Sequence, residues 1–198
     1  MRGDHAPGTA LKPQGLARDQ GVSLAVVREA PVRLVGAGLA DRLPNRGFAV
    51  PEYSDRRWQE IAEARRTVEP VLLRLSIERG DVDWEARVRA AHHLLARTPA
   101  FAPKEGAYYT EAWSEAHRRC HRTLLEGCGN PVLLETFDRL WTASELARRW
   151  SAHRNPDRDG AAEHRRLEEA ALSRDADTAA AVLTRHLTLT ATGLTDPA

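Results

Sequence analysis

Cysteine is scarce in this chain, and the only two are Cys120 and Cys128. Both fall on one predicted helix, about 12 Å apart along its axis, and a disulfide cannot span that distance. The chain also has no apolar run long enough to cross a membrane and no hydrophobic segment of the signal-peptide kind. These absences predict a reduced, cytoplasmic protein with no membrane segment.

Lysine and net charge are low as well. Lys12 and Lys104 are the only lysines, arginine supplies the other basic residues, and the formal net charge is +1. No overall basic field therefore favours nucleic acid, so any contact with DNA must be local. The sequence has no internal repeat and no phosphate-binding glycine loop. Hydrophobic residues make up 42% of the 198 positions, which is enough for a packed core.

Apolar residues recur with helical spacing from Trp58 onward. Breakers such as Gly80-Asp81 and Gly129-Asn130-Pro131 divide this region. The fold class is therefore mostly α, with residues 51–55 as a linker between an N-terminal unit, residues 1–52, and a helical unit, residues 55–198. The predicted helices of the second unit are 57–79, 83–97, 107–127, 131–152, 160–173 and 176–193.

A shorter pattern precedes the linker. One helix is predicted at residues 15–20, the turn Gln20-Gly21-Val22 follows, and Ser23 is a good N-cap for a second helix that continues to Leu34. Two apolar runs between residues 39 and 50 flank Pro44-Asn45-Arg46-Gly47 and predict a β-hairpin with a basic tip. Helix, turn, helix and hairpin follow one another in the same order in a winged helix-turn-helix, whose second helix enters the DNA major groove.

Three residues of this unit are candidate DNA contacts. Ser23 and the backbone amides around it suit a phosphate at the positive end of the second helix. Arg28, further along that helix, suits a base edge or a phosphate, and Arg46 at the hairpin tip suits a phosphate or the minor groove. A small helical hairpin with solvated arginines has the same pattern, so the residues alone leave both interpretations open.

Four histidines lie on apolar stripes of three predicted helices. His117 and His121 are four residues apart and project from one side of a helix, and His164 and His186 lie on the stripes of the last two helices. Histidines on converging helix faces are how a helical bundle builds a metal site in its core. A single histidine on an apolar face is more often a hydrogen-bonded core residue, so both interpretations stay open from the pattern alone.

Residues 22–50 resemble the DNA-binding region of GntR-family transcriptional regulators. The downstream helices resemble the effector domain of the FadR subfamily, known as FCD, and the form of residues 24–29 together with the paired histidines is most similar to its carbon-starvation-type branch. The segments that carry the downstream resemblance are Arg65–Pro70, His117–His121, Gly129–Pro131, Glu163–Leu167 and His186–Leu187. Together they span nearly the whole chain.

This resemblance implies a homodimeric, ligand-controlled repressor or activator that binds operator DNA. It implies an antiparallel helical bundle that binds a small carboxylate effector, often through a divalent metal. His121, His164 and His186 match the metal ligands, and the fourth ligand is left open because His117 stands where many members carry aspartate. A neutral imidazole there favours zinc or nickel over a hard ion. Arg65 matches an arginine near the effector, and its guanidinium suits a carboxylate.

The chain departs from the family pattern in its DNA-binding unit. The family's first helix should precede residues 3–11, and the chain begins at Met1, so we expect Leu16, Val26, Ala30 and Leu34 to lack apolar partners. Pro31 falls inside the second helix, where we expect it to disrupt the helix at a cost of roughly 3 kcal/mol. At position 24, a leucine replaces a base-contacting arginine and can contact only a thymine methyl group.

Two alternative functions follow from these observations. The missing helix and Pro31 are compatible with an effector-binding dimer that has lost DNA binding. A metal-dependent helical-bundle enzyme ranks lower, because no general acid or base stands beside the histidines. Glu115 and Glu163 neighbour them in sequence, but we expect both side chains to point away from the histidine stripes.

Overall fold

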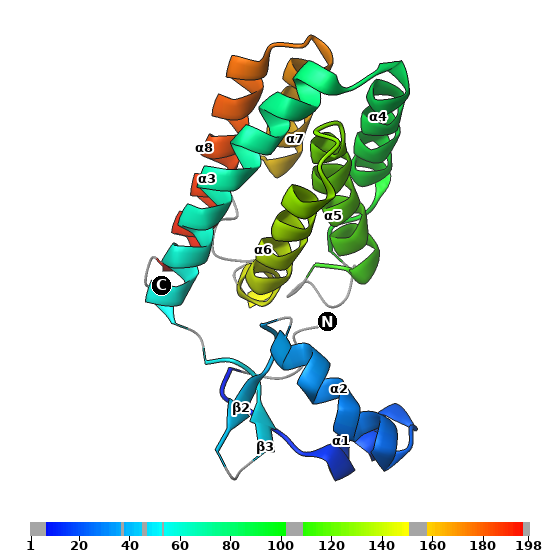
Figure 1. Cartoon of the computed structure of the whole chain (residues 1–198), viewed down its shortest axis with the longest axis vertical. Coiled ribbons are helices and arrows are strands. Elements are labelled where there is room, and N and C mark those ends of the chain that lie inside the picture. The colour runs from blue at the N-terminus through cyan, green and yellow to red at the C-terminus, as the bar shows by residue number, and fades with distance from the viewer. Residues whose placement is uncertain are drawn as a thin grey trace.

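The computed structural model describes residues 7–36, 38–44, 47–52, 54–101, 109–150 and 158–195. Within these residues the chain forms eight helices and one three-stranded antiparallel sheet, so the fold is mostly α, as predicted. In Figure 1 a helical bundle lies above the sheet and the first two helices. None of the described helices is both long and apolar enough to cross a membrane.

Six helices form the bundle, at positions close to those predicted. Asp81 caps one of them by accepting a hydrogen bond from the Trp84 amide. Another begins later than the predicted residue 107, because Thr110 caps it and Tyr109 pairs with Phe101 in an extended bridge just before it. The six are α3 (Asp55–Arg79), α4 (Val82–Arg97), α5 (Glu111–Glu126), α6 (Pro131–Trp150), α7 (Gly160–Leu172) and α8 (Ala176–Thr195).

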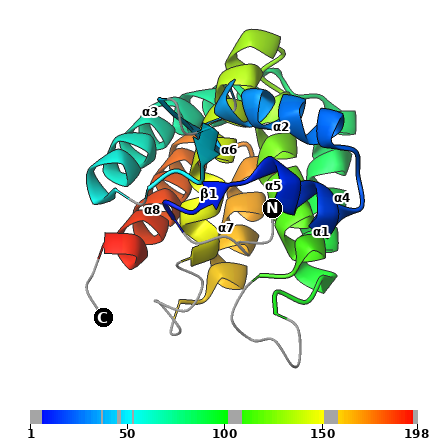
Figure 2. The ribbon, with the colours of Figure 1, turned by 90° about the horizontal axis from the view of Figure 1, so that it is seen from below.

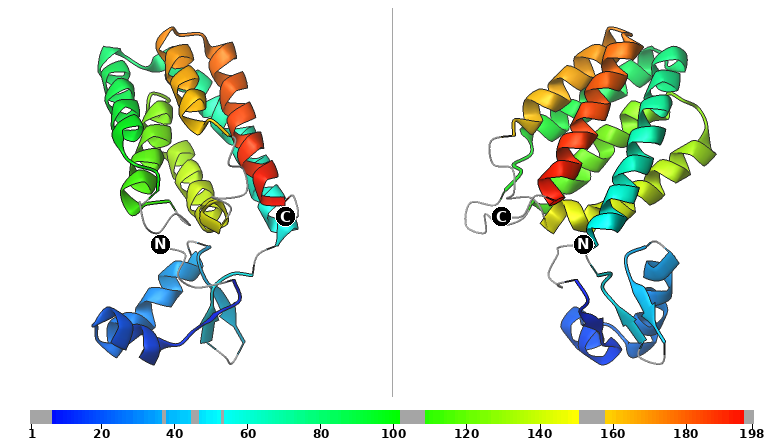
Figure 3. Two further views of the ribbon diagram at one scale, coloured as in Figure 1. Left: turned by 180° about the vertical axis from the view of Figure 1, so that it is seen from behind. Right: turned by 90° about the vertical axis from the view of Figure 1, so that its left-hand side faces the viewer.

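The bundle is held together by extensive helix contacts. α3 and α8 run antiparallel beside each other, as both views of Figure 3 show, while α4 packs on α5 and α7 on α8. Seen from below in Figure 2, the N-terminal helices lie in front of the bundle, whose helices share one hydrophobic core. This core includes the buried side chains of Trp84, Phe137, Leu167 and Leu183. Burial of each such side chain stabilises the fold by about 1.5–3 kcal/mol.

The N-terminal unit contains two helices and the sheet. Gly21 ends the first helix with φ at 63°, the left-handed conformation that favours glycine, so the predicted turn is confirmed. The predicted hairpin is also present, with Arg42 opposite Phe48. The first strand, Ala10–Leu11, was not predicted; it pairs with the third strand, Gly47–Ala49, so that the third strand lies in the middle of the sheet. The elements are β1 (Ala10–Leu11), α1 (Pro13–Gln20), α2 (Leu24–Gly36), β2 (Asp41–Leu43) and β3 (Gly47–Ala49).

Pro31 does not interrupt α2, so the expected disruption of this helix is wrong. The helix is continuous from Leu24 to Gly36, and the proline ring is fully buried. Proline removes one backbone donor, which leaves the carbonyl of Val27 without its usual helical partner. Burial of the apolar ring offsets part of that loss, because the ring leaves water.

The apolar residues of α1 and α2 are only partly uncovered. Leu16 and Leu34 pack against a small core that includes Leu11 and Val50, contrary to the expectation that they lack partners. Val26 is 58% exposed, as expected. The sheet therefore covers one side of α2, and another side faces solvent.

Candidate metal centre

Helices α5, α7 and α8 bring the four histidines together. His117 and His121 lie one turn apart on α5, His164 lies on α7 and His186 lies on α8. All four are buried, and their ligand nitrogens lie within 4.8 Å of one another. The Nε2 atoms of His121 and His164 are 3.2 Å apart. Two tetrahedral zinc ligands, each about 2.0–2.1 Å from the ion, lie about 3.4 Å apart, so this pair already has a suitable spacing.

Hydrogen bonds from Nδ1 orient two of the rings. His164 Nδ1 lies 2.6 Å from the Gly160 carbonyl oxygen, which only accepts, so the ring donates. His186 Nδ1 lies 2.8 Å from Glu163 Oε2, and an ionised carboxylate also only accepts. Both rings therefore carry their proton on Nδ1 and leave the Nε2 lone pair for a metal, as metal-binding histidines do.

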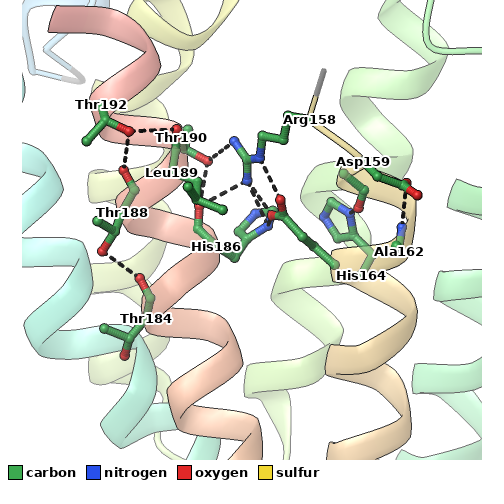
Figure 4. A network of polar contacts seen from close by, with 12 residues as sticks. Arg158, Asp159, Ala162, His164, Thr184, His186, Thr188, Leu189, Thr190 and Thr192 are labelled. Carbon is green, nitrogen blue, oxygen red and sulfur yellow. Dashed lines mark hydrogen bonds and ion pairs between the residues drawn. The ribbon is translucent and has the colours of Figure 1, made fainter. Parts of the chain in front are cut away.

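Glu163 does not point away from the histidines, so that expectation is wrong. Arg158 donates to its two carboxylate oxygens at 2.9 and 2.6 Å, and to Thr190 Oγ1 at 2.8 Å (Figure 4). Glu163 lies in the first turn of α7, where its side chain reaches across to His186 on α8. Glu115, in contrast, is exposed as expected.

Burial keeps the imidazoles neutral. It lowers the pKa of His164 to about 3, and lowers the pKa of His117 and His121 well below the usual value. Burial also acts to raise the pKa of Glu163, but hydrogen bonds from Arg158 and His186 outweigh it and lower that pKa to about 2. The site thus presents neutral imidazoles, the form that binds metal, beside one ionised carboxylate.

His117 has no hydrogen-bond partner for either ring nitrogen among the described residues, although both atoms are buried. Leaving a buried polar group unsatisfied costs about 1–3 kcal/mol. The ring stacks on Trp113 with centroids 4.6 Å apart, which holds it beside the other three histidines. A metal ion bound to one nitrogen of His117 would satisfy that atom, so the residues present fit a metal ion.

A cavity of about 460 Å³ opens against the histidine cluster. His117, His164 and His186 form part of its wall. Arg148 and Arg158 also line it, and among the described lining residues there is no aspartate or glutamate. Glu145 and Glu163 pair with these two arginines but do not line the cavity, so guanidinium groups rather than carboxylates face the space beside the candidate metal site, which suits an anion.

Arg65, the predicted effector contact, is not among the described residues that line this cavity. Its guanidinium donates to both carboxylate oxygens of Glu69, at 2.5 and 3.3 Å, and to Ser144 Oγ at 3.1 Å. The guanidinium carbon also lies 5.0 Å from the centre of the Trp141 ring. The structure thus places Arg65 in a buried internal network, and Arg148 and Arg158 on the cavity wall.

Sequence reasoning missed Arg148 and Arg158. Arg148 belongs to an inward stripe of α6 with Trp141, Ser144 and Glu145, all buried. Three polar residues at core spacing are a signal that could have pointed to it. Arg158 precedes α7 in a loop, where no periodicity applies.

The predicted DNA contacts lie in the N-terminal unit. Ser23 precedes α2 and its hydroxyl accepts from the Val26 amide at 3.4 Å, so the predicted cap is present. Arg28 lies in α2, but its side chain is outside the described part of the structure. Arg46 lies outside the described residues altogether. Contact of these three residues with DNA stays a prediction.

Comparison with known proteins decides the family. The FCD domain family matches residues 60–189, a range that includes all four histidines. The chain is also 31% identical over 188 residues to the uncharacterized HTH-type transcriptional regulator BphR of Paraburkholderia xenovorans (strain LB400), across 94% of this chain and 77% of that protein. The chain belongs to the FCD-domain regulators of the GntR family.

A second relative of this GntR-family regulator is the HTH-type transcriptional repressor GlaR of Escherichia coli (strain K12). It is 29% identical over 197 residues, across 94% of this chain and 86% of that protein. Because these relatives regulate transcription, the enzyme alternative does not hold.

Solved structures show the same fold. E. coli McbR/YncC has a TM-score of 0.75 at 21% identity, over 94% of this chain and 87% of that chain. A GntR regulator from Rhodococcus sp. RHA1 has a TM-score of 0.72 at 22% identity, over 98% of this chain and 90% of that chain.

Proposed function

We propose that this FCD regulator binds operator DNA as a homodimer and senses a small carboxylate through a metal held by His117, His121, His164 and His186. The observation that carries the proposal is the convergence of four buried imidazoles from three helices, three of which, His117, His164 and His186, also line a cavity that Arg148 and Arg158 share.

The donor set supports zinc or nickel as the metal. Four imidazole nitrogens are borderline ligands, which these ions accept more readily than magnesium or calcium does. A bound ion would supply a Lewis-acid position for one oxygen of a carboxylate. Glu163 and the Gly160 carbonyl keep the rings of His186 and His164 in the tautomer that can bind the ion.

Arg148 and Arg158 are the proposed partners of the effector's carboxylate. Both line the cavity, and each already has an acidic neighbour, Glu145 and Glu163 respectively. Guanidinium groups bind carboxylates with charge-assisted hydrogen bonds. Arg65 would contribute to effector binding only indirectly, because its guanidinium packs on the ring of the buried Trp141.

In the proposed DNA-binding unit, α2 is the recognition helix and the β2–β3 hairpin is the wing. Ser23 at the start of α2, together with Arg28 and Arg46, supplies the proposed contacts. The uninterrupted α2 favours DNA binding over the alternative of an effector-binding dimer that has lost this activity.

A mobility-shift titration with the DNA upstream of the protein's own gene tests the function. At fixed salt, the zinc-loaded protein is expected to bind one fragment specifically, and Arg28→Ala to weaken binding about tenfold. Arg74→Ala, which changes an arginine of α3 in the bundle, is the matched control. Absence of a specific shift, with a dimer and metal binding intact, would favour the alternative.

A further inference from the structure

The cavity beside the histidines has one aromatic wall. Phe101 and Tyr109 stack with ring centroids 5.0 Å apart, and Tyr109 stacks on Trp113 at 4.3 Å. Trp113 in turn stacks on His117 at 4.6 Å. These four rings form a column, hereafter the aromatic column, and every ring of it lines the cavity. The column leads from the cavity wall directly to the candidate metal site.

Stacking determines which part of each ring is left for a ligand. Tyr109 lies between Phe101 and Trp113. Trp113 lies between Tyr109 and His117, with interplanar angles of 16° to Tyr109 and 15° to His117. The inner rings therefore offer their edges rather than their faces to the cavity. Ring edges carry partial positive charge and attract the electron-rich face of another aromatic ring.

The charge of the cavity sets the charge of that ligand. Arg148, Arg158 and Arg165 line it, and its described lining residues include no carboxylate. Glu145 and Glu163 pair with Arg148 and Arg158 from outside the lining, whereas Arg165 has no ion pair among the described residues, so the lining itself presents only cationic side chains and disfavours a cation, which aromatic surfaces also attract. An anion with a flat aromatic body matches both the arginines and the ring edges.

We infer that the effector is an aromatic carboxylate whose ring lies against the edges of the aromatic column and whose carboxylate points to the histidine cluster. This inference rests on the proposed function, because it specifies the class of carboxylate that the proposed sensor binds. The volume of about 460 Å³ suits such a body, since pockets of roughly 300–1,000 Å³ hold ligands much larger than a two-carbon acid.

Benzoate and cyclohexanecarboxylate provide the direct comparison. Both carry one carboxylate on a six-carbon ring, but only benzoate has an aromatic face. Calorimetric titration of the zinc-loaded, full-length protein should show benzoate binding about fivefold or more tighter, the difference expected from one or two edge-to-face contacts. Succinate serves as the carboxylate with no ring.

Two variants at one position assign the difference to the column. Tyr109→Leu is expected to reduce the preference for benzoate to less than about twofold, whereas Tyr109→Phe keeps an aromatic ring and should retain it. The circular dichroism spectrum and the melting temperature of the zinc-loaded protein verify that the leucine variant is folded. If Tyr109→Leu keeps the full preference, the assignment to the column is overturned.

The possible results separate this inference from the proposed function. Equal affinity for benzoate and cyclohexanecarboxylate, or binding of succinate alone, overturns the aromatic inference and leaves carboxylate sensing in place. Failure of all three acids to bind the zinc-loaded protein overturns both. A benzoate preference that Tyr109→Leu abolishes supports both.

Discussion

Replacing Glu163 by glutamine should weaken metal binding, because Glu163 decides which nitrogen of His186 carries the proton. His186 Nδ1 has two neighbours: Glu163 Oε2 at 2.8 Å and the Nη2 atom of Arg158 at 3.1 Å. The carboxylate accepts a proton from Nδ1 and leaves Nε2 free for a metal. The guanidinium only donates, so it favours the opposite tautomer, in which Nδ1 accepts and Nε2 is protonated.

In the wild-type protein we expect His186 to carry its proton on Nδ1, because the Glu163 carboxylate stays ionised and is held in place by two hydrogen bonds from Arg158. Glutamine has one acceptor oxygen and no charge, so Arg158 competes for both the amide oxygen and His186 Nδ1. Losing an outer partner of a metal-binding histidine typically costs 10–100-fold in metal affinity, or roughly 1.4–2.7 kcal/mol. We expect Glu163→Gln to weaken zinc binding by about tenfold or more.

Zinc affinity is measured by competition with a chromogenic chelator at neutral pH. Glu115→Gln, which changes an exposed glutamate of α5 between Trp113 and His117, is the control and should bind zinc normally. The double variant Glu163→Gln, Arg158→Met removes the competing donor and should regain part of the affinity. Unchanged zinc affinity in Glu163→Gln would refute the reasoning, since packing alone would then hold the His186 tautomer.

Three further predictions concern the same core. Protein stripped of metal should gain about one zinc per chain and melt at a higher temperature when zinc is added, because the ion binds the folded state, and His164→Ala should abolish this response in calorimetry. Metal-free protein should lose stability below about pH 6.5, because each histidine with a lowered pKa takes up its proton only on unfolding. Chemical denaturation should show the free energy of unfolding falling by about 1.4 kcal/mol per pH unit per histidine, down to about pH 3 for His164. A free energy of unfolding that stays constant between about pH 7 and pH 5 would contradict this prediction. Arg65→Met should destabilise the fold by about 3–5 kcal/mol because Glu69 stays buried without its partner, and Arg65→Met with Glu69→Leu should be less destabilised than the single variant in urea.

Helix positions followed closely from the sequence, because apolar periodicity and capping residues are local signals. Asp81 and Gly21 mark breaks between helices that the structure confirms, whereas the helix predicted from residue 107 begins only after its cap Thr110. Strand β1 could not be found this way. Its two residues, Ala10 and Leu11, are extended because β3 lies beside them, and that pairing joins segments far apart in the chain.

Most of the metal site was also accessible from the sequence. Periodicity shows which side of a helix faces the core, and it placed His117, His121, His164 and His186 on inward stripes. It carries no information on loops, which is why Arg158 was missed. It also gives no distance between helices, so the stacking of Phe101 on Tyr109, across the connection between α4 and α5, required the structure.

Two residues show where local rules and longer-range contacts compete. Arg65 and Glu69 are four residues apart on one helix, a spacing that by itself predicts an ion pair, and the structure contains that pair in the interior. The local spacing therefore accounts for the observed contacts of Arg65, and its contact with an effector stays a prediction. Glu163 is the opposite case. Glu163 directly precedes His164 on α7, so helical geometry places it off the inward stripe. Its carboxylate nevertheless accepts hydrogen bonds from His186 and Arg158 instead of from water. A long side chain in the first turn of a helix can leave its own stripe when a neighbouring helix offers a charged or donor partner, and such residues are found only when both helices are in view.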